Sequence, residues 1–251
     1  MIPGEPAVMS WQSASRARLA AVLRVVAVVL LATSTVTGLQ AAWSRWAVCY
    51  VDADPPLGGL PDDRAAACEA LQDHRYDNTL PTDPWAPIAD AAQREGVSYL
   101  ALGLAVVLVA VTVRDRRLVR AVGAAVGVMW LALAVPTLRS GLAGEPVGSD
   151  LPAGVAPLAF VMPFITLTLA AFAAARGTRD GRLEGLFWVT MTAAQPLPEF
   201  FVTQMLWSSY DSSPLAGFVR CVAVVGAGLA VAATLLPASR RPALVRRRAH
   251  G

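Results

Sequence analysis

The sequence is poor in charged residues and in cysteine, and it contains no lysine. Charged side chains make up 16% of its 251 residues and hydrophobic ones 55%, whereas an ordinary soluble domain carries roughly 25% charge. Intrinsic disorder is excluded, because a disordered chain needs low hydrophobicity. Three cysteines in a chain of this length exclude a disulfide-dense mini-protein. The mean hydropathy of +0.51 indicates a chain that is dissolved in lipid.

The sequence motifs of several common enzyme classes are also missing. There is no phosphate-binding loop of the G-x-x-x-x-G-K-[ST] type, no G-x-G-x-x-G before a helix, no H-E-x-x-H and no G-x-S-x-G. We therefore expect no cofactor, assign no catalytic residue and no metal site, and lean against an enzyme. The pI near 9.0 would favour a nucleic-acid partner only if the positive charge formed one patch. It is spread over several segments, so no nucleic-acid partner is expected.

Six apolar stretches are long enough, or nearly so, to cross a bilayer as helices. A spanning helix needs ~20 mostly apolar residues, because the hydrocarbon core is ~30 Å thick and each residue rises ~1.5 Å. None of the stretches alternates in the manner of a barrel strand. The expected fold is therefore all-α, a polytopic bundle of six transmembrane helices. The predicted spans are 19–41, 98–113, 119–138, 155–175, 183–207 and 216–237.

The arginines predict how this bundle is oriented. The connection 114–120 holds four arginines, the connection 176–182 three and the tail 238–251 five, and the segment 1–18 adds two. The segment 42–97 has four arginines against ten acids. Cytoplasmic connections carry the excess of positive charge. We therefore expect a multi-pass protein of the cell membrane with both termini in the cytoplasm. The first span is read as uncleaved, with a signal peptide as the alternative.

Aromatic residues cluster near the predicted outer ends of the spans. Tryptophan and tyrosine are enriched at membrane–water interfaces, where an apolar ring meets a polar tip. The sequence therefore predicts an outer aromatic belt of Trp43, Trp46, Tyr50, Tyr99, Trp207 and Tyr210.

The segment 42–97 is predicted to form a small cap outside the membrane. Cys49 and Cys68 lie on the oxidising side, 19 positions apart, and are expected to form a disulfide. Asp73, His74 and Asp77 are candidate ligand contacts in this cap. A zinc site needs three or four ligands, and no second histidine is available here. A solvated, salt-bridged helix end is the favoured interpretation of these three residues.

The fifth predicted span carries a stripe of polar side chains. Thr192, Gln195, Glu199 and Thr203 are spaced by three, four and four residues, which places them on one arc of a helix. A carboxyl group is costly in lipid, so this arc should face other helices or water.

Two prolines interrupt the same span. Pro196 and Pro198 lack N–H groups and predict a kink or a break, with Pro198 and Glu199 opening a second short helix. Arg220 lies at a similar depth in the sixth span. We expect Glu199 and Arg220 to form an ion pair inside the outer leaflet.

Three functions remain open from the sequence. The first choice is a membrane scaffold or accessory protein that engages a membrane-protein partner, or a second copy of itself, through the outer cap or the basic tail. The alternative is a small-solute or ion transporter or channel with a site at Gln195, Glu199 and Arg220. A membrane-embedded enzyme comes third. A water-reachable cavity lined by Glu199, Arg220 and Gln195 would favour transport, and a dry, fully packed ion pair under a flat cap would favour the scaffold.

Overall fold

The computed structural model describes residues 6–50, 62–113, 117–148, 155–209 and 211–237, and the regular secondary structure in those ranges consists of helices without strands. The all-α prediction is confirmed. Four of the helices are long and apolar enough to cross a membrane, namely α1 (counted from Ala14), α3, α4 and α8. The helices are α1 (Pro6–Tyr50), α2 (Asp62–Ala70), the short 3-10 helix η1 (His74–Tyr76), α3 (Ala91–Thr112), α4 (Arg117–Ala143), α5 (Val155–Ala175), α6 (Arg179–Ala193), α7 (Pro196–Leu206) and α8 (Phe218–Leu235).

The helix boundaries differ from the predicted ones mainly around the first connection. α1 has 45 residues and a length of about 68 Å at ~1.5 Å per residue. It takes in residues 42–50, and α3 takes in residues 91–97, so the connection is shorter than the predicted 42–97. The helix-forming run Gln40–Val48 contains no proline or glycine that would end α1 at Ala41.

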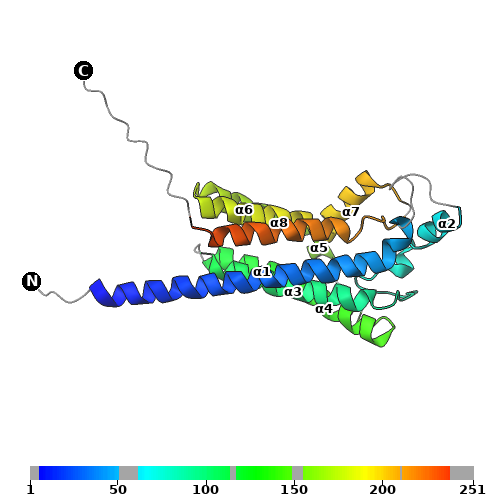
Figure 1. Ribbon diagram of the computed structural model, residues 1–251, viewed down its shortest axis with the longest axis horizontal. Helices are drawn as coiled ribbons and strands as arrows, with labels where there is room; N and C mark the ends of the chain where they lie inside the picture. The colour runs from blue at the N-terminus through cyan, green and yellow to red at the C-terminus, as the bar shows by residue number, and fades with distance from the viewer. Residues whose placement is uncertain (1–5, 51–61, 114–116, 149–154, 210, 238–251) are drawn as a thin grey trace, which may run out of the picture.

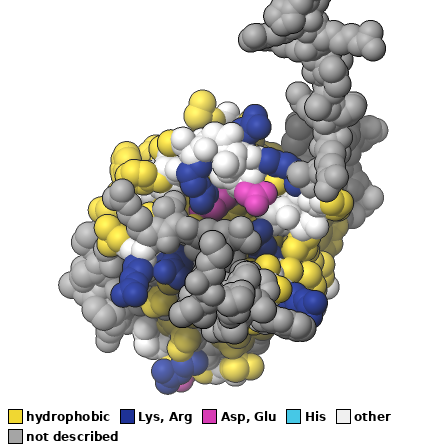
Figure 2. Space-filling view, turned by 90° about the vertical axis from the view of Figure 1, so that its left-hand side faces the viewer, with side chains coloured by type: hydrophobic (Ala, Val, Ile, Leu, Met, Phe, Trp, Pro, Cys, Tyr) yellow, Lys and Arg dark blue, Asp and Glu magenta, His cyan; other side chains and the backbone are white. Residues whose placement is uncertain are grey.

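The long helices lie side by side along one direction (Figure 1). α2 and α7 gather at one end of the bundle, whereas α1 begins and α8 ends at the opposite end. We call residues 62–90 and 207–217 the cap and their end of the molecule the cap end. The opposite end is the arginine end. Figure 2 looks onto it and shows more arginine than acidic side chains. The tail 238–251 and Tyr210 lie outside the described residues.

The core of the bundle is built around α3. This helix packs against α1 and α4. α8 packs against both α1 and α6, and α6 also packs against α5. Leu102 and Val106 of α3 are completely buried, as is Met191 of α6. The outward faces are apolar as well, with Phe164 and Leu229 more than 60% exposed. A helix that is apolar on both its inner and its outer face is typical of a membrane span.

Two glycines let α3 and α4 approach closely. A methyl group on Gly103 would lie 2.8 Å from the carbonyl oxygen of Gly127, and one on Gly127 would lie 2.7 Å from that of Gly103. A methyl group on Gly123, one turn from Gly127, would lie 3.0–3.1 Å from Ala110 and Trp188. The G-x-x-x-G spacing of Gly123 and Gly127 therefore lies at a close helix crossing.

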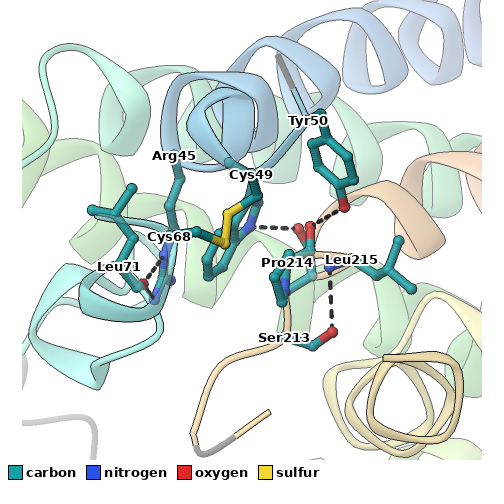
Figure 3. Close-up of a disulfide and its surroundings, with 10 residues drawn as sticks. Arg45, Cys49, Tyr50, Cys68, Leu71, Ser213, Pro214 and Leu215 are labelled. Carbon is teal, nitrogen blue, oxygen red and sulfur yellow. Dashed lines mark hydrogen bonds between the residues drawn. A yellow bond between two sulfur atoms is a disulfide. The ribbon is translucent and has the colours of Figure 1, made fainter. Parts of the chain in front are cut away.

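The cap is fastened to the end of α1 that lies at the cap end. The predicted disulfide is present between Cys49 and Cys68, with the two Cα atoms 5.1 Å apart. Beside it, the Arg45 guanidinium donates to the carbonyl of Leu71, with Nη2 2.7 Å from the oxygen (Figure 3). Arg45 also pairs with Asp77. One covalent bond and one arginine thus fix α2 and the residues after it against α1.

The connection between α7 and α8 is part of the same cap. The Trp46 indole N–H donates to the carbonyl of Ala216 over 3.1 Å. The Tyr50 hydroxyl donates to the carbonyl of Pro214 over 2.8 Å (Figure 3). Trp46 is 1% exposed. The expected belt is therefore wrong for Trp46, because its ring packs inside the protein, whereas Trp43 is 50% exposed.

Substituting Gly127 with alanine is expected to destabilise the bundle by about 1–3 kcal/mol, because the added methyl group overpacks the crossing of α3 and α4. Gly228→Ala is the matched control, since its methyl group meets its nearest neighbour at 3.7 Å. The measurement is thermal unfolding of both variants in the same detergent. Equal melting temperatures for the two variants would contradict the close crossing.

Candidate functional site

The fifth predicted span is broken at Ala194 and Gln195. α6 ends at Ala193, and α7 begins at Pro196 with Gln195 as its N-cap residue in an extended conformation. Pro196 has no N–H for the carbonyl of Thr192, and the Gln195 N–H bonds to that carbonyl instead, over 3.1 Å. The second helix therefore starts two residues before the expected Pro198.

Glu199 caps the start of a different helix. Its Oε1 accepts the backbone N–H of Gly217 at 2.7 Å and that of Arg220 at 3.2 Å. Gly217 is the N-cap residue of α8 and has no side chain with which to satisfy these donors. Its φ of +87° and the 2.9 Å separation between an added Cβ and Ala42 both require glycine. Glu199 in the first turn of α7 thus lies at the positive ends of two helices.

Arg220 takes its main counter-charge from α3. Its Nη2 lies 2.7 Å and 2.8 Å from the two carboxylate oxygens of Glu95. Its Nη1 is 3.8 Å from Glu199 Oε2, which is an ion-pair distance but too long for a hydrogen bond. Both charged groups of the close pair are buried, with side chains 5% and 7% exposed. The contact between Glu199 and Arg220 is therefore secondary to the Glu95–Arg220 pair.

A tyrosine and a threonine complete a hydrogen-bonded ring around this pair. Arg220 Nη1 donates to the Tyr99 hydroxyl over 2.7 Å, and that hydroxyl lies 2.7 Å from the Thr79 hydroxyl. Thr79 donates in turn to Glu95 over 3.3 Å. Because the single proton of the Thr79 hydroxyl is donated to Glu95, the Tyr99 proton is directed to Thr79. Tyr99 is 1% exposed, so its expected place in the aromatic belt is wrong.

A cavity of about 200 Å³ lies next to this ring, between the cap and the bundle. Residues of α1, the cap, α3, α7 and α8 form its wall. Asp77 is one of these wall residues, and its side chain is 40% exposed. The polar and charged residues of the wall are Arg45, Asp77, Asn78, Thr79, Glu95, Tyr99, Glu199, Thr203, Ser212, Ser213 and Arg220.

The charges of the cavity wall do not balance. Three acids, Asp77, Glu95 and Glu199, face two arginines, Arg45 and Arg220, which leaves a formal charge of −1. Arg45 is already engaged by Asp77 and by the carbonyls of Leu71 and Asp73. A charge inside a helix bundle is strongly disfavoured unless it is paired. The wall therefore favours the approach of a positive group.

The polar stripe of the broken span is divided between two environments. Glu199 and Thr203 line the cavity, and Thr203 is buried. Thr192 lies deeper and shares a hydrogen bond with Thr166 of α5, 2.8 Å between hydroxyl oxygens. Gln195 is 4% exposed, lies outside the cavity wall, and its Nε2 has no hydrogen-bond partner among the described residues. The structure thus brings together Glu199 and Arg220 of the predicted transport site, without Gln195.

The three candidate residues of the cap hold local structure. Asp73 is the N-cap residue of η1 and accepts the Arg75 N–H over 2.9 Å. His74 Nδ1 lies 3.4 Å from carboxylate oxygens of both Asp73 and Asp211. Asp77 pairs with Arg45 and is the one of the three that reaches the cavity. Within the described ranges, no group of three or more His, Cys, Asp and Glu side chains could hold a metal ion.

Sequence reasoning missed Glu95 and Arg45 as site residues. Glu95 was one of ten acids in the segment 42–97, and Arg45 one of its four arginines. A signal was present, because Glu95, Ser98 and Tyr99 follow the i, i+3, i+4 spacing of one helix face at the start of an apolar run. Ser98 extends this polar face and bonds to Ser34 of α1.

Comparisons of this chain with protein-family models, with curated proteins and with solved structures find no match. The interpretation of the site therefore rests on its geometry.

Replacing Glu95 by glutamine is expected to cost more stability than replacing Glu199 by glutamine. Glu95→Gln leaves Arg220 without its close counter-charge, and breaking a buried ion pair costs on the order of 3–5 kcal/mol. Glu199→Gln keeps an amide oxygen that can accept the Gly217 N–H. Melting temperatures of both variants, measured in detergent, test this order.

Asp90→Asn provides the surface control, because Asp90 pairs with Arg94 at an exposed i, i+4 position worth less than ~1 kcal/mol. A smaller loss for Glu95→Gln than for Glu199→Gln would show that Glu199 is the main partner of Arg220.

Proposed function

We propose that the protein crosses the cell membrane six times, with both termini in the cytoplasm and the cap outside. α5 is an apolar helix of 21 residues, and α6 and α7 together supply 26 helical residues around the break. Neither α6 nor α7 alone reaches the ~20 residues of a span. The described arginines of the arginine end, which include Arg117, Arg120 and Arg182, support a cytoplasmic location for that end (Figure 2).

Within this topology, the function that the geometry supports best is binding of a small polar solute from outside, as a step in its transport. The observation that carries the proposal is the polar cavity that reaches Glu199 beside the break of α6–α7. Broken helices commonly frame the substrate sites of membrane transporters. One helical turn further in, the buried side chains Leu102 and Val224 belong to the apolar core, which closes the cavity toward the arginine end. This corresponds to a site accessible from one side.

The scaffold role was the first expectation from the sequence, and it remains an untested prediction. A dry, fully packed ion pair under a flat cap would have favoured the scaffold, whereas Glu199 and Arg220 both line a cavity. The basic tail that was expected to engage a partner lies outside the described residues. Solute binding is therefore preferred.

Two single-cysteine variants test the topology across α5. Ala143 ends α4 at the cap end, Ala175 ends α5 at the arginine end, and both are exposed. Ala143→Cys should react with a membrane-impermeant thiol reagent in intact cells, and Ala175→Cys only after permeabilisation. The unsubstituted protein is the control, because Cys221 is buried and the other two cysteines form a disulfide. Labelling of both variants from the same side would rule out α5 as a span.

A thermal-shift screen on the protein in lipid nanodiscs tests solute binding. We expect at least one member of a panel of small anions, cations, zwitterions and neutral polar molecules to raise the melting temperature, since a ligand at 100 times its Kd stabilises by ~2.7 kcal/mol. Ala216 lines the cavity, so Ala216→Trp should fill it and abolish the shift. Ala143→Trp places the same side chain outside the cavity and should preserve it. No shift with any solute, or an equal shift in Ala216→Trp, would contradict the proposal.

A further inference from the structure

Some polar atoms of the cavity wall already have hydrogen-bond partners in the protein and others do not. This difference indicates which kind of solute would fit. Both oxygens of Glu95 are bonded to Arg220, and Glu199 Oε1 accepts two backbone N–H groups. Glu199 Oε2 is left with a single contact among the described residues, 3.8 Å from Arg220 Nη1. One carboxylate oxygen at the cavity wall therefore has unused capacity to accept hydrogen bonds.

Asn78 supplies an independent second acceptor. It lines the cavity, is 9% exposed, and its Oδ1 has no hydrogen-bond partner among the described residues. An unpartnered buried polar atom costs about 1–3 kcal/mol, and a hydrogen bond from a ligand would remove that cost. Glu199 Oε2 and Asn78 Oδ1 are both acceptors, and a ligand that brings N–H or O–H donors would satisfy them.

The remaining wall favours an organic ligand. Ala41, Ala42, Pro196 and Phe200 form an apolar part of the cavity surface. The volume of about 200 Å³ corresponds to about seven waters at ~30 Å³ each, which is room for a small molecule with a short hydrocarbon portion. Together with the formal charge of −1, the wall combines negative charge, free acceptors and apolar surface.

Resting on the proposed solute site, we propose that the cavity binds a small organic ammonium ion. Its N–H groups donate to Glu199 Oε2 and to Asn78, and its hydrocarbon portion lies against Phe200 and Pro196. The ammonium charge neutralises the surplus carboxylate of the wall. Arg220 remains bound to Glu95, so its positive charge is already paired and is not available to bind an anion.

The test uses n-propylammonium as the probe, with the protein in lipid nanodiscs and binding measured by calorimetry. Propionate has a similar size and the opposite charge, and propanol has a similar size and no charge. Tetramethylammonium is a cation without N–H donors. Sodium at equal ionic strength tests for an alkali-metal site. We expect n-propylammonium to bind most tightly. Tighter binding of any of the other four would overturn the assignment.

Two variants of the site locate the binding. Glu199→Gln should weaken n-propylammonium binding by about tenfold or more, equivalent to ~1.4 kcal/mol. Asn78→Asp has the same shape with an added negative charge and should strengthen binding several-fold, a gain that misfolding cannot imitate. Asp90→Asn removes an acid outside the cavity wall and should leave the affinity unchanged. Unaltered affinity in both Glu199→Gln and Asn78→Asp would overturn the assignment.

The outcome separates this inference from the proposed function. Binding of propionate or propanol that Ala216→Trp abolishes would refute the ammonium ion and leave the solute site standing. Absence of binding by any of the probes, together with no shift in the wider screen, would refute both.

Discussion

The charge of Arg220 is the constraint around which the cap end is built. A guanidinium does not lose its proton inside a protein, so its charge has to be compensated by neighbours. Arg220 also lies in the first turn of α8, where the helix dipole is itself positive. Glu95 of α3 forms an ion pair with the Arg220 side chain. Glu199 of α7 accepts a backbone N–H at the start of α8. Arg220 thus ties α8 to α3, from a residue 125 positions away in the sequence, and the start of α8 is tied to α7.

This arrangement gives a physical reason for the break in the fifth predicted span. The start of α8 has glycine as its N-cap residue, so its N–H groups need an acceptor from elsewhere. The break at Gln195 starts a new helix whose first turn brings Glu199 to the Gly217 N–H. The polar cavity lies where these helix starts meet the cap, and its surplus negative charge follows from using two carboxylates to satisfy one arginine.

Local patterns predicted those parts of the structure that depend on a single segment. Hydropathy gave the helical fold, and the spacing and redox environment of Cys49 and Cys68 gave the disulfide. The prolines indicated a break, but the choice of Pro196 over Pro198 as the first residue of α7 depends on the Gln195 N–H satisfying the Thr192 carbonyl. Such a choice between two equivalent prolines is made by local geometry that composition does not encode.

The site depended on pairings between segments, and these were predicted only in part. Arg220 has two acids within reach, and depth along the spans identified Glu199 because both residues border the same short connection. Glu95 is 125 positions from Arg220, and no local pattern specifies that these two residues pair. Its helix face, shared with Ser98 and Tyr99, was the available signal.

The walls of the cavity are fastened in two different ways, and this bears on how a solute could pass. The cap side is held by the Cys49–Cys68 disulfide, by Arg45, and by the bonds of Trp46 and Tyr50 to the connection before α8. α7 is held at the cavity mainly by Glu199, and by the Ser213 hydroxyl on the Thr203 carbonyl. Those are polar contacts next to a break in the backbone helix, and the outer face of α7 is exposed apolar surface. If entry or release of a solute moves one wall, α7 is the wall whose movement breaks the fewest strong contacts, and Glu199 is the residue that would couple that movement to the occupant.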